Sequence, residues 1–184
     1  MNKAIVIYSS KRGSTKQYAE WIAEDLRCEA VPFSEIKNVN LYEYSAIIYG
    51  GWIRGSGIVD FDVFRKKWLT SDLVDKLIVF GVGVAKATPE NYMQVYDINY
   101  KKLAKEGEHN PTLYILSGAY DPAKVTGFDK ALMGVMKKVL ISGAKAANAD
   151  DDAKALADAL ENGIQAVERK NVDAIVKEAR KLCE

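Results

Sequence analysis

The stretch Val6–Ile22 decides the fold, and it reads VIYSSKRGSTKQYAEWI. An apolar, β-branched run stops at a loop of hydroxyls, cations and one glycine, and a helical pattern begins at once. The free N–H groups and the partial positive charge of such a helix start attract an anion. The loop also offers hydroxyl donors, Ser9, Ser10, Ser14 and Thr15. We therefore predict that a phosphate binds between this strand and this helix.

Two other kinds of phosphate loop are excluded by spacing. The Walker pattern needs a glycine at a fixed distance before Gly-Lys-Ser/Thr, and no glycine precedes Lys11 there. The dinucleotide fingerprint needs several glycines, whereas this loop has only Gly13, which permits a close or left-handed backbone. The alternative that stays open is a turn rich in serine and glycine that caps the helix and binds nothing.

The same stretch resembles the signature of the flavodoxin family. That signature specifies two aliphatic residues, an aromatic residue, Ser or Thr, a small residue, Thr, Ala and an aliphatic residue at fixed spacing. Its defined positions are filled by Val6, Ile7, Tyr8, Ser10, Gly13, Thr15, Ala19 and Ile22. In that family the loop holds the monophosphate of FMN. By resemblance this role falls to Ser10, Lys11, Arg12, Gly13, Ser14 and Thr15.

Length and composition are those of one ordinary globular domain. The chain has 184 residues, of which 48% are hydrophobic and 28% charged, and we expect a single domain over residues 1–184. A net charge of +1 argues against nucleic-acid binding driven by bulk electrostatics. We find no apolar run of about 18 residues and no signal peptide, so we expect a cytoplasmic protein without a transmembrane segment.

The two cysteines and the single histidine do not form a catalytic or metal-binding pattern. Cys28 and Cys183 lie far apart in the sequence, and we interpret them as a buried strand thiol and a frayed terminal thiol. His109 stands in the polar stretch 106–111 and is interpreted as a solvated loop residue. We predict no catalytic residue and no metal site.

Strand-length apolar runs alternate with helical patterns, which is typical of a parallel sheet covered on both faces. The predicted strands are Lys3–Tyr8, Glu29–Phe33, Ala46–Gly50, Leu77–Val82 and Leu113–Ser117. Predicted helices are Ser14–Leu26, Val63–Leu69 capped near Asp60, one beginning at Thr88-Pro89-Glu90, and a helical tail over 148–184 interrupted near Asn162-Gly163. The fold class is α/β, a doubly wound five-stranded parallel sheet in three layers. The resemblance implies the flavodoxin-like strand order 2-1-3-4-5.

Ligands of such sheets lie beyond the carboxyl ends of the strands, where the winding direction reverses. The loop after the third strand contains Gly51, Trp52, Ile53, Arg54 and Gly55. Its glycines permit a close backbone approach, and Trp52 offers a flat apolar face that suits an isoalloxazine ring. The alternative for Trp52 is a core residue that closes the end of the sheet.

The loop after the fourth strand is glycine-bearing and apolar as well. We assign Gly83 and Val84 to the ring site, because their backbone can form hydrogen bonds with the pyrimidine edge of a flavin. Glycine retained for close packing is the competing explanation. The end of the fifth strand, residues 116–122, is a weaker candidate for the same site.

Cations distinguish this chain from ordinary flavodoxins, which are acidic around the flavin. Lys11 and Arg12 flank the phosphate loop, Arg54 stands in the ring loop and Lys86 follows the third loop. Positive charge near the ring favours reduced flavin. Whether Arg54 reaches the ring or points to water stays open.

A helical insertion at about 121–145 gives a second distinguishing feature. Apolar residues recur at helical spacing over Thr126–Gly143 with lysines between them, a pattern that suits packing on the domain, a substrate channel or peripheral membrane contact. With Ile53-Arg54-Gly55, this segment is similar to the quinone-linked, FMN-dependent protoporphyrinogen oxidases. The arginine- and aromatic-rich run of those oxidases is replaced here by residues 123–127, AKVTG.

Two functions follow from these patterns, and a third stays open. We predict an FMN-binding electron carrier that exchanges electrons with a redox partner such as a flavoprotein reductase. The alternative is an FMN- and quinone-dependent oxidase of a porphyrinogen-like organic substrate. The third possibility is an interaction module that kept the fold without the flavin.

Overall fold

The computed structural model describes residues 3–85, 87–101, 110–125 and 151–184, together with residues 134, 137, 138, 141, 142 and 144. The strands are β1 (Ala4–Ser9), β2 (Glu29–Pro32), β3 (Ala46–Arg54), β4 (Gly57–Ile58), β5 (Leu77–Gly83), β6 (Thr112–Ser117), β7 (Ala119–Tyr120) and β8 (Ile164–Gln165). The α-helices are α1 (Ser14–Leu26), α2 (Phe61–Trp68), α3 (Ser71–Val74), α4 (Pro89–Tyr100), α6 (Asp151–Asn162) and α7 (Asp173–Leu182). Short 3₁₀ helices are η1 (Phe33–Asn38), η2 (Leu41–Glu43), η3 (Pro122–Lys124) and η4 (Arg169–Val172).

The central sheet confirms the predicted topology. Its parallel strands lie in the order β2-β1-β3-β5-β6, and β4 pairs only with β3, in the antiparallel sense. With β4 set aside, the five parallel strands in chain order are 2-1-3-4-5, as predicted. The inner strands β1, β3 and β5 are buried along almost their whole length because helices cover both faces of the sheet.

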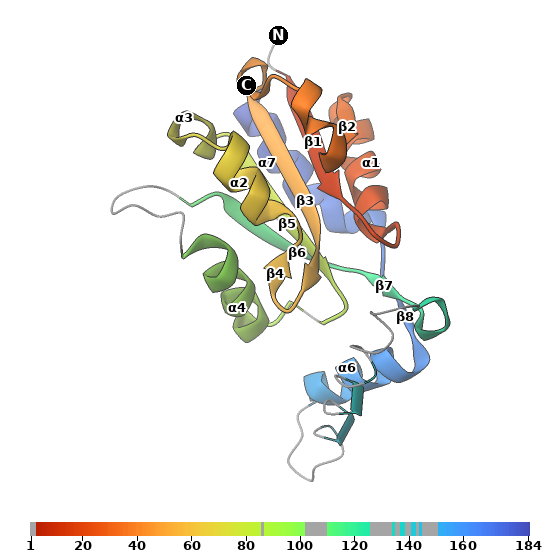
Figure 1. Ribbon diagram of the computed structural model, residues 1–184. Helices are drawn as coiled ribbons and strands as arrows, with labels where there is room; N and C mark the ends of the chain where they lie inside the picture. Colours follow the sequence, from red (N-terminus) through yellow and green to blue (C-terminus); the bar gives the residue numbers. More distant parts are fainter. Residues whose placement is uncertain are drawn as a thin grey trace.

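Two separate hydrophobic clusters show which helices cover which face. On one face α1 and α7 pack against alternate strand residues such as Val6, Ile48 and Phe80. On the other face α2, α3 and α4 pack against Ile7 and its neighbours in β3 and β5. The result is the predicted three-layer α/β/α arrangement, with α7 beside α1 in Figure 1.

The largest difference from the predicted elements is at the end of β3. The prediction ended this strand at Gly50, but it continues to Arg54 and turns back through β4, pairing Ile53 with Ile58. The predicted ring loop is therefore a short β-hairpin. The turn is possible because Gly55 and Ser56 both adopt left-handed backbone angles, with φ of 54° and 63°.

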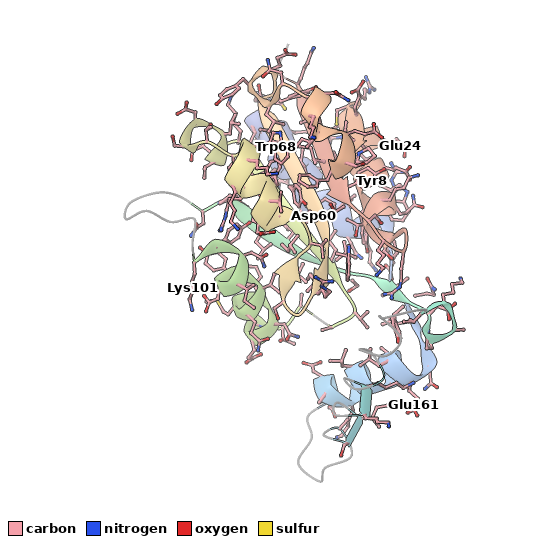
Figure 2. The ribbon with its side chains drawn as sticks, viewed as in Figure 1. Tyr8, Glu24, Asp60, Trp68, Lys101 and Glu161 are labelled. Carbon is pink, nitrogen blue, oxygen red and sulfur yellow. The ribbon has the colours of Figure 1, made fainter. Side chains whose placement is uncertain are left out.

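Helix α2 begins at Phe61, two residues earlier than predicted. Asp60 does occupy the position before the helix, yet among the described residues its carboxylate does not cap the helix, and its φ is 61°. The carboxylate instead accepts a hydrogen bond from Ser9 Oγ at 2.7 Å. Asp60 is thus turned toward β1, and Figure 2 shows it among the central elements of the fold.

The C-terminal tail contains the predicted interruption. Helix α6 ends at Asn162, and Gly163 then takes a φ of 87°. The chain returns as β8, which pairs with β7 through Ala119↔Gln165 and Tyr120↔Ile164, so residues 121–163 form one excursion from the sheet. Helix α6 lies beyond the carboxyl end of the sheet in Figure 1. The proposed insertion at 121–145 lies within this excursion, and its predicted helix at 126–143 falls almost wholly outside the described residues, as does His109.

The cysteines are closer together than the sequence suggested. Both are partly buried and pack against the cluster under α1 and α7. Cys183 is not frayed, since its N–H donates to the carbonyl oxygens of Ala179 and Arg180 at the end of α7. Burial, with the neighbouring Cys183 and Glu29 as smaller causes, raises the pKa of the Cys28 thiol to about 12.

This raised pKa predicts slow chemistry at Cys28. Thiolate is the reactive form, and a raised pKa lowers the fraction of thiolate at pH 8. A thiolate of higher pKa is a better nucleophile, but on a logarithmic scale this gain offsets only about half of the lost thiolate fraction. We therefore expect alkylation at pH 8 to be about thirtyfold slower than for an unfolded thiol. Iodoacetamide labelling followed by peptide mass spectrometry measures this, with the urea-unfolded chain as control. Equal labelling rates in the folded and unfolded chain would contradict the prediction.

Candidate functional site

The carboxyl ends of β1, β3, β5 and β6 meet around one pocket. It is a hollow of about 470 Å³, counting the space open to solvent. Its described lining residues are Ser10, Lys11, Arg12, Ser14, Thr15, Trp52, Ile53, Val82, Gly83, Val84, Gly118, Ala119 and Tyr120. The structure thus brings together most of the residues that the sequence assigned to a site, from three separate parts of the chain.

The phosphate-loop candidates form one wall of the pocket, except Gly13, which is not part of its described lining. Gly13 stands before α1 with a φ of 98°, and a Cβ there would meet no described atom within 4 Å. Among the described residues no side chain caps α1, and its first turn contains no acidic residue. The start of the helix therefore presents an uncapped positive end beside open space.

Ser14 and Thr15 are held firmly at this helix start. Thr15 is only 1% exposed. Ser14 Oγ accepts a hydrogen bond from the N–H of Ala119 at 3.3 Å, which ties the phosphate loop to the segment after β6. The hydroxyl of Ser14 still carries a proton that an anion can accept.

Ser9 does not belong to the described lining of this pocket. It is 8% exposed, and its hydroxyl donates to Asp60 Oδ2 at 2.7 Å. Burial raises the pKa of the Tyr49 phenol, and the Ser9 hydroxyl partly offsets this rise. Ser9 therefore fastens β1 to the base of the β3–β4 hairpin, and the hydroxyls facing the pocket are those of the residues that follow it.

Trp52 forms the wall opposite the phosphate loop, and two cations lie against it. Lys11 Nζ is 5.6 Å from the centre of the Trp52 ring, and the guanidinium carbon of Arg54 is 5.8 Å from it. Cations at these distances are attracted to the face of an indole. The guanidinium of Arg54 thus lies over Trp52, although Arg54 is exposed and is not part of the described lining.

The remaining glycines of the hairpin have packing roles. A Cβ on Gly51 would lie 2.5 Å from Cγ2 of Ile58, so Gly51 allows the hairpin to close. Gly55 supplies one of the two left-handed residues at the hairpin turn. Chain geometry therefore explains why glycine stands at these two positions, and neither residue is part of the described lining of the pocket.

The third wall comes from β5 and from the segment after β6. Gly83 and Val84 line the pocket, and the N–H of Gly118 donates to the Gly83 carbonyl oxygen at 2.7 Å. Gly118, Ala119 and Tyr120 complete this wall. The sequence marked 116–122 only as a weaker candidate, since a short turn after a strand carries no motif. The signal that could have identified this segment is its place after β6, because the carboxyl ends of neighbouring parallel strands lie at the same edge of the sheet.

Comparison with known proteins identifies the family. A family model of the flavodoxin domain matches residues 5–146. This chain belongs to the flavodoxin domain family. A search of curated protein sequences gives no significant match.

Solved structures similar to this flavodoxin domain include a pilus assembly-related protein from Burkholderia pseudomallei (10% identity, TM-score 0.45, covering 99% of this chain and 92% of that one). A flavodoxin from the domain Archaea has 20% identity and a TM-score of 0.40, with 87% and 97% covered. Flavodoxin 2 from Bacillus cereus has 16% identity and a TM-score of 0.40, with 86% and 95% covered. Similarities of this size do not bear on function.

Membership of this family implies that the protein binds a flavin and transfers electrons. Among the described residues that line the pocket of this flavodoxin domain, the charged ones are the cations Lys11 and Arg12. Within the described part of the chain, no helix is both long enough and apolar enough to cross a membrane.

Proposed function

We propose that this flavodoxin domain binds FMN and exchanges electrons with a redox partner. The supporting observation is the convergence, in one pocket, of the uncapped start of α1 and the flat face of Trp52. The described residues therefore fit the cofactor that the family implies.

Each wall of the pocket has a distinct part in holding FMN. The start of α1, with Ser10, Ser14 and Thr15, would hold the phosphate. Trp52 would contact the ring, and the backbone at Gly83 and Gly118 would border it. Bound FMN supplies reversible one- and two-electron redox chemistry, so no protein acid, base or nucleophile is required.

The cations at Trp52 would tune this cofactor. Lys11 and Arg54 both lie against the indole ring. Positive charge at this wall lowers the free energy of a reduced, anionic flavin and so raises its reduction potential. We infer that this domain accepts electrons more readily than an acidic flavodoxin does. Its partner would be a flavoprotein reductase or a comparable redox protein.

FMN titration of the purified apoprotein tests the proposal. We expect FMN fluorescence to be quenched at one equivalent per chain, with riboflavin binding at least about tenfold more weakly because it lacks the phosphate that the helix start attracts. Thr15→Val, which removes one buried hydroxyl at nearly constant volume, should weaken FMN binding but not riboflavin binding. Lack of FMN uptake by the unmodified chain would overturn the proposal.

The cationic pocket also supports a second candidate function. Residues 118–120 line the pocket and lead directly into residues 121–125, the described start of the segment that resembles the quinone-linked protoporphyrinogen oxidases. This arrangement suits an FMN- and quinone-dependent oxidase of a porphyrinogen-like substrate. Quinone-coupled formation of protoporphyrin by the FMN-loaded protein tests it. Rapid reduction by a flavoprotein reductase without any such turnover would leave the electron carrier.

A further inference from the structure

The β3–β4 hairpin, which carries Trp52 and Arg54, is too short to hold its own shape. Only two residue pairs, Ile53↔Ile58 and Arg54↔Gly57, join its strands. Its turn uses two consecutive left-handed residues, one of which, Ser56, is not glycine. A hairpin of this length is marginal in water without support from elsewhere. The central sheet holds Trp52, which pairs with Val82 of β5. The tip of the hairpin beyond it, residues 53–58, must therefore be fixed by contacts outside the hairpin.

Asn99 of α4 supplies those contacts. It is 8% exposed, one of only three polar residues among the buried residues that the structure describes. Its Oδ1 accepts a hydrogen bond from the N–H of Ile58 at 2.9 Å, and its Nδ2 donates to the carbonyl oxygens of Ser56 at 2.9 Å and Val95 at 2.6 Å. Two of these three bonds hold the hairpin, one on each side of Gly57.

The bonds of Asn99 lead directly to the pocket wall. Ile58, which Asn99 holds, is followed by Val59, whose N–H donates to the Trp52 carbonyl oxygen at 3.0 Å. Val59 in turn accepts a hydrogen bond from the Tyr49 hydroxyl at 2.9 Å. On the other side, the Arg65 guanidinium of α2 donates to the Asn99 carbonyl oxygen at 3.0 Å, which fixes the asparagine itself.

We propose that Asn99 is a positioning residue that holds the tip of the hairpin, and with it the Arg54 guanidinium, at a fixed place beside the ring of FMN and thereby tunes its reduction potential. This inference rests on the proposed function. Asn99 is absent from the described pocket lining and acts through the hairpin backbone. Loss of its side-chain bonds would let the hairpin tip move, so the guanidinium of Arg54 would no longer keep a fixed distance from the ring.

The test compares Asn99→Leu, which keeps the volume but forms no hydrogen bond, with Asn99→Asp, which keeps the acceptor for the Ile58 N–H and loses both donated bonds. The control is Leu73→Ala, a fully buried truncation on α3 before β5, at the opposite end of the sheet. Three quantities are measured: amide exchange in the apoprotein, the dissociation constants for oxidised and reduced FMN, and the urea midpoint.

We expect Asn99→Leu to accelerate amide exchange at residues 53–58 by about tenfold or more, because the two hydrogen bonds that hold the hairpin are lost and exchange reports local opening. The ratio of the dissociation constants for oxidised and reduced FMN should change by about threefold or more, and at least as much for Asn99→Asp, whose carboxylate would face the carbonyl oxygens of Ser56 and Val95. Leu73→Ala should lower the urea midpoint without altering that ratio.

The outcomes separate the inference from the function on which it rests. If the unmodified chain takes up no FMN, the proposed function fails. If the chain binds FMN but both Asn99 variants keep the unmodified ratio, the positioning role is wrong even when their stability falls. If Asn99→Leu does not fold, Asn99→Asp decides in the same way. A ratio that Leu73→Ala changes equally would show a general effect of stability and would also overturn the inference.

Discussion

An aspartate in place of Ser14 is expected to weaken FMN binding by at least about 100-fold while the fold is kept or made slightly more stable. Ser14 is the first residue of α1, where a carboxylate favours the helix dipole by about 0.5 kcal/mol. The same carboxylate would face a phosphate that carries nearly two negative charges. Like charges in contact across a partly buried site repel by about 3–4 kcal/mol. This energy is larger than the one that corresponds to a 100-fold loss of FMN affinity.

Fluorescence titration with FMN and urea unfolding of the apoprotein measure the two effects separately. The control is Ser14→Ala, which removes the hydrogen bond from the Ala119 N–H without adding charge. It should weaken FMN binding by about tenfold at most. Equal affinities of the aspartate and alanine variants would mean that the anion binds elsewhere, because only the first places a charge at the helix start.

The order of the sheet and most of its strands could be predicted from the sequence because the pattern is strong there. Buried parallel strands read as continuous apolar runs, and α1 has the predicted bounds, Ser14–Leu26. The hairpin after β3 could not be predicted. Its strand β4 is two residues long, and its turn depends on Ser56 adopting a left-handed angle that few non-glycine residues take.

The lining of the candidate site was predictable where backbone chemistry defines it and less so where the orientation of side chains decides. Residues 10–15 have a loop-to-helix pattern that indicates an anion site whatever the tertiary packing. Ser9 differs because a strand residue can point to either face, and its partner, Asp60, is 51 residues away in sequence. The support from Asn99 is equally long-range, since it joins α4 to a hairpin about 41 residues earlier in the chain.

Gly50→Ala is expected to destabilise the domain by about 2–3 kcal/mol, the largest effect that we predict on folding. Gly50 lies in β3 directly opposite Phe80 of β5. A Cβ on Gly50 would lie 2.0 Å from Cζ of the Phe80 ring, and Phe80 itself is fully buried. The ring cannot accept a methyl group at that distance without leaving its place in the core, so the cost is that of overpacking.

Shortening the opposing side chain should relieve this clash, which makes the cause testable. Phe80→Leu alone leaves a cavity, but in the double variant the added methyl occupies part of it. We therefore expect the loss of unfolding free energy in the double variant to be smaller than the sum of the two single losses by about 1 kcal/mol or more. Gly57→Ala is the matched control, because its Cβ would meet its neighbours only at 3.5 Å and beyond. That change should stay within about 0.5 kcal/mol of the unmodified chain. If urea unfolding shows that the two single losses add strictly, contact with Phe80 does not set the cost of Gly50→Ala. Gly50 would then be required by the backbone of β3 instead.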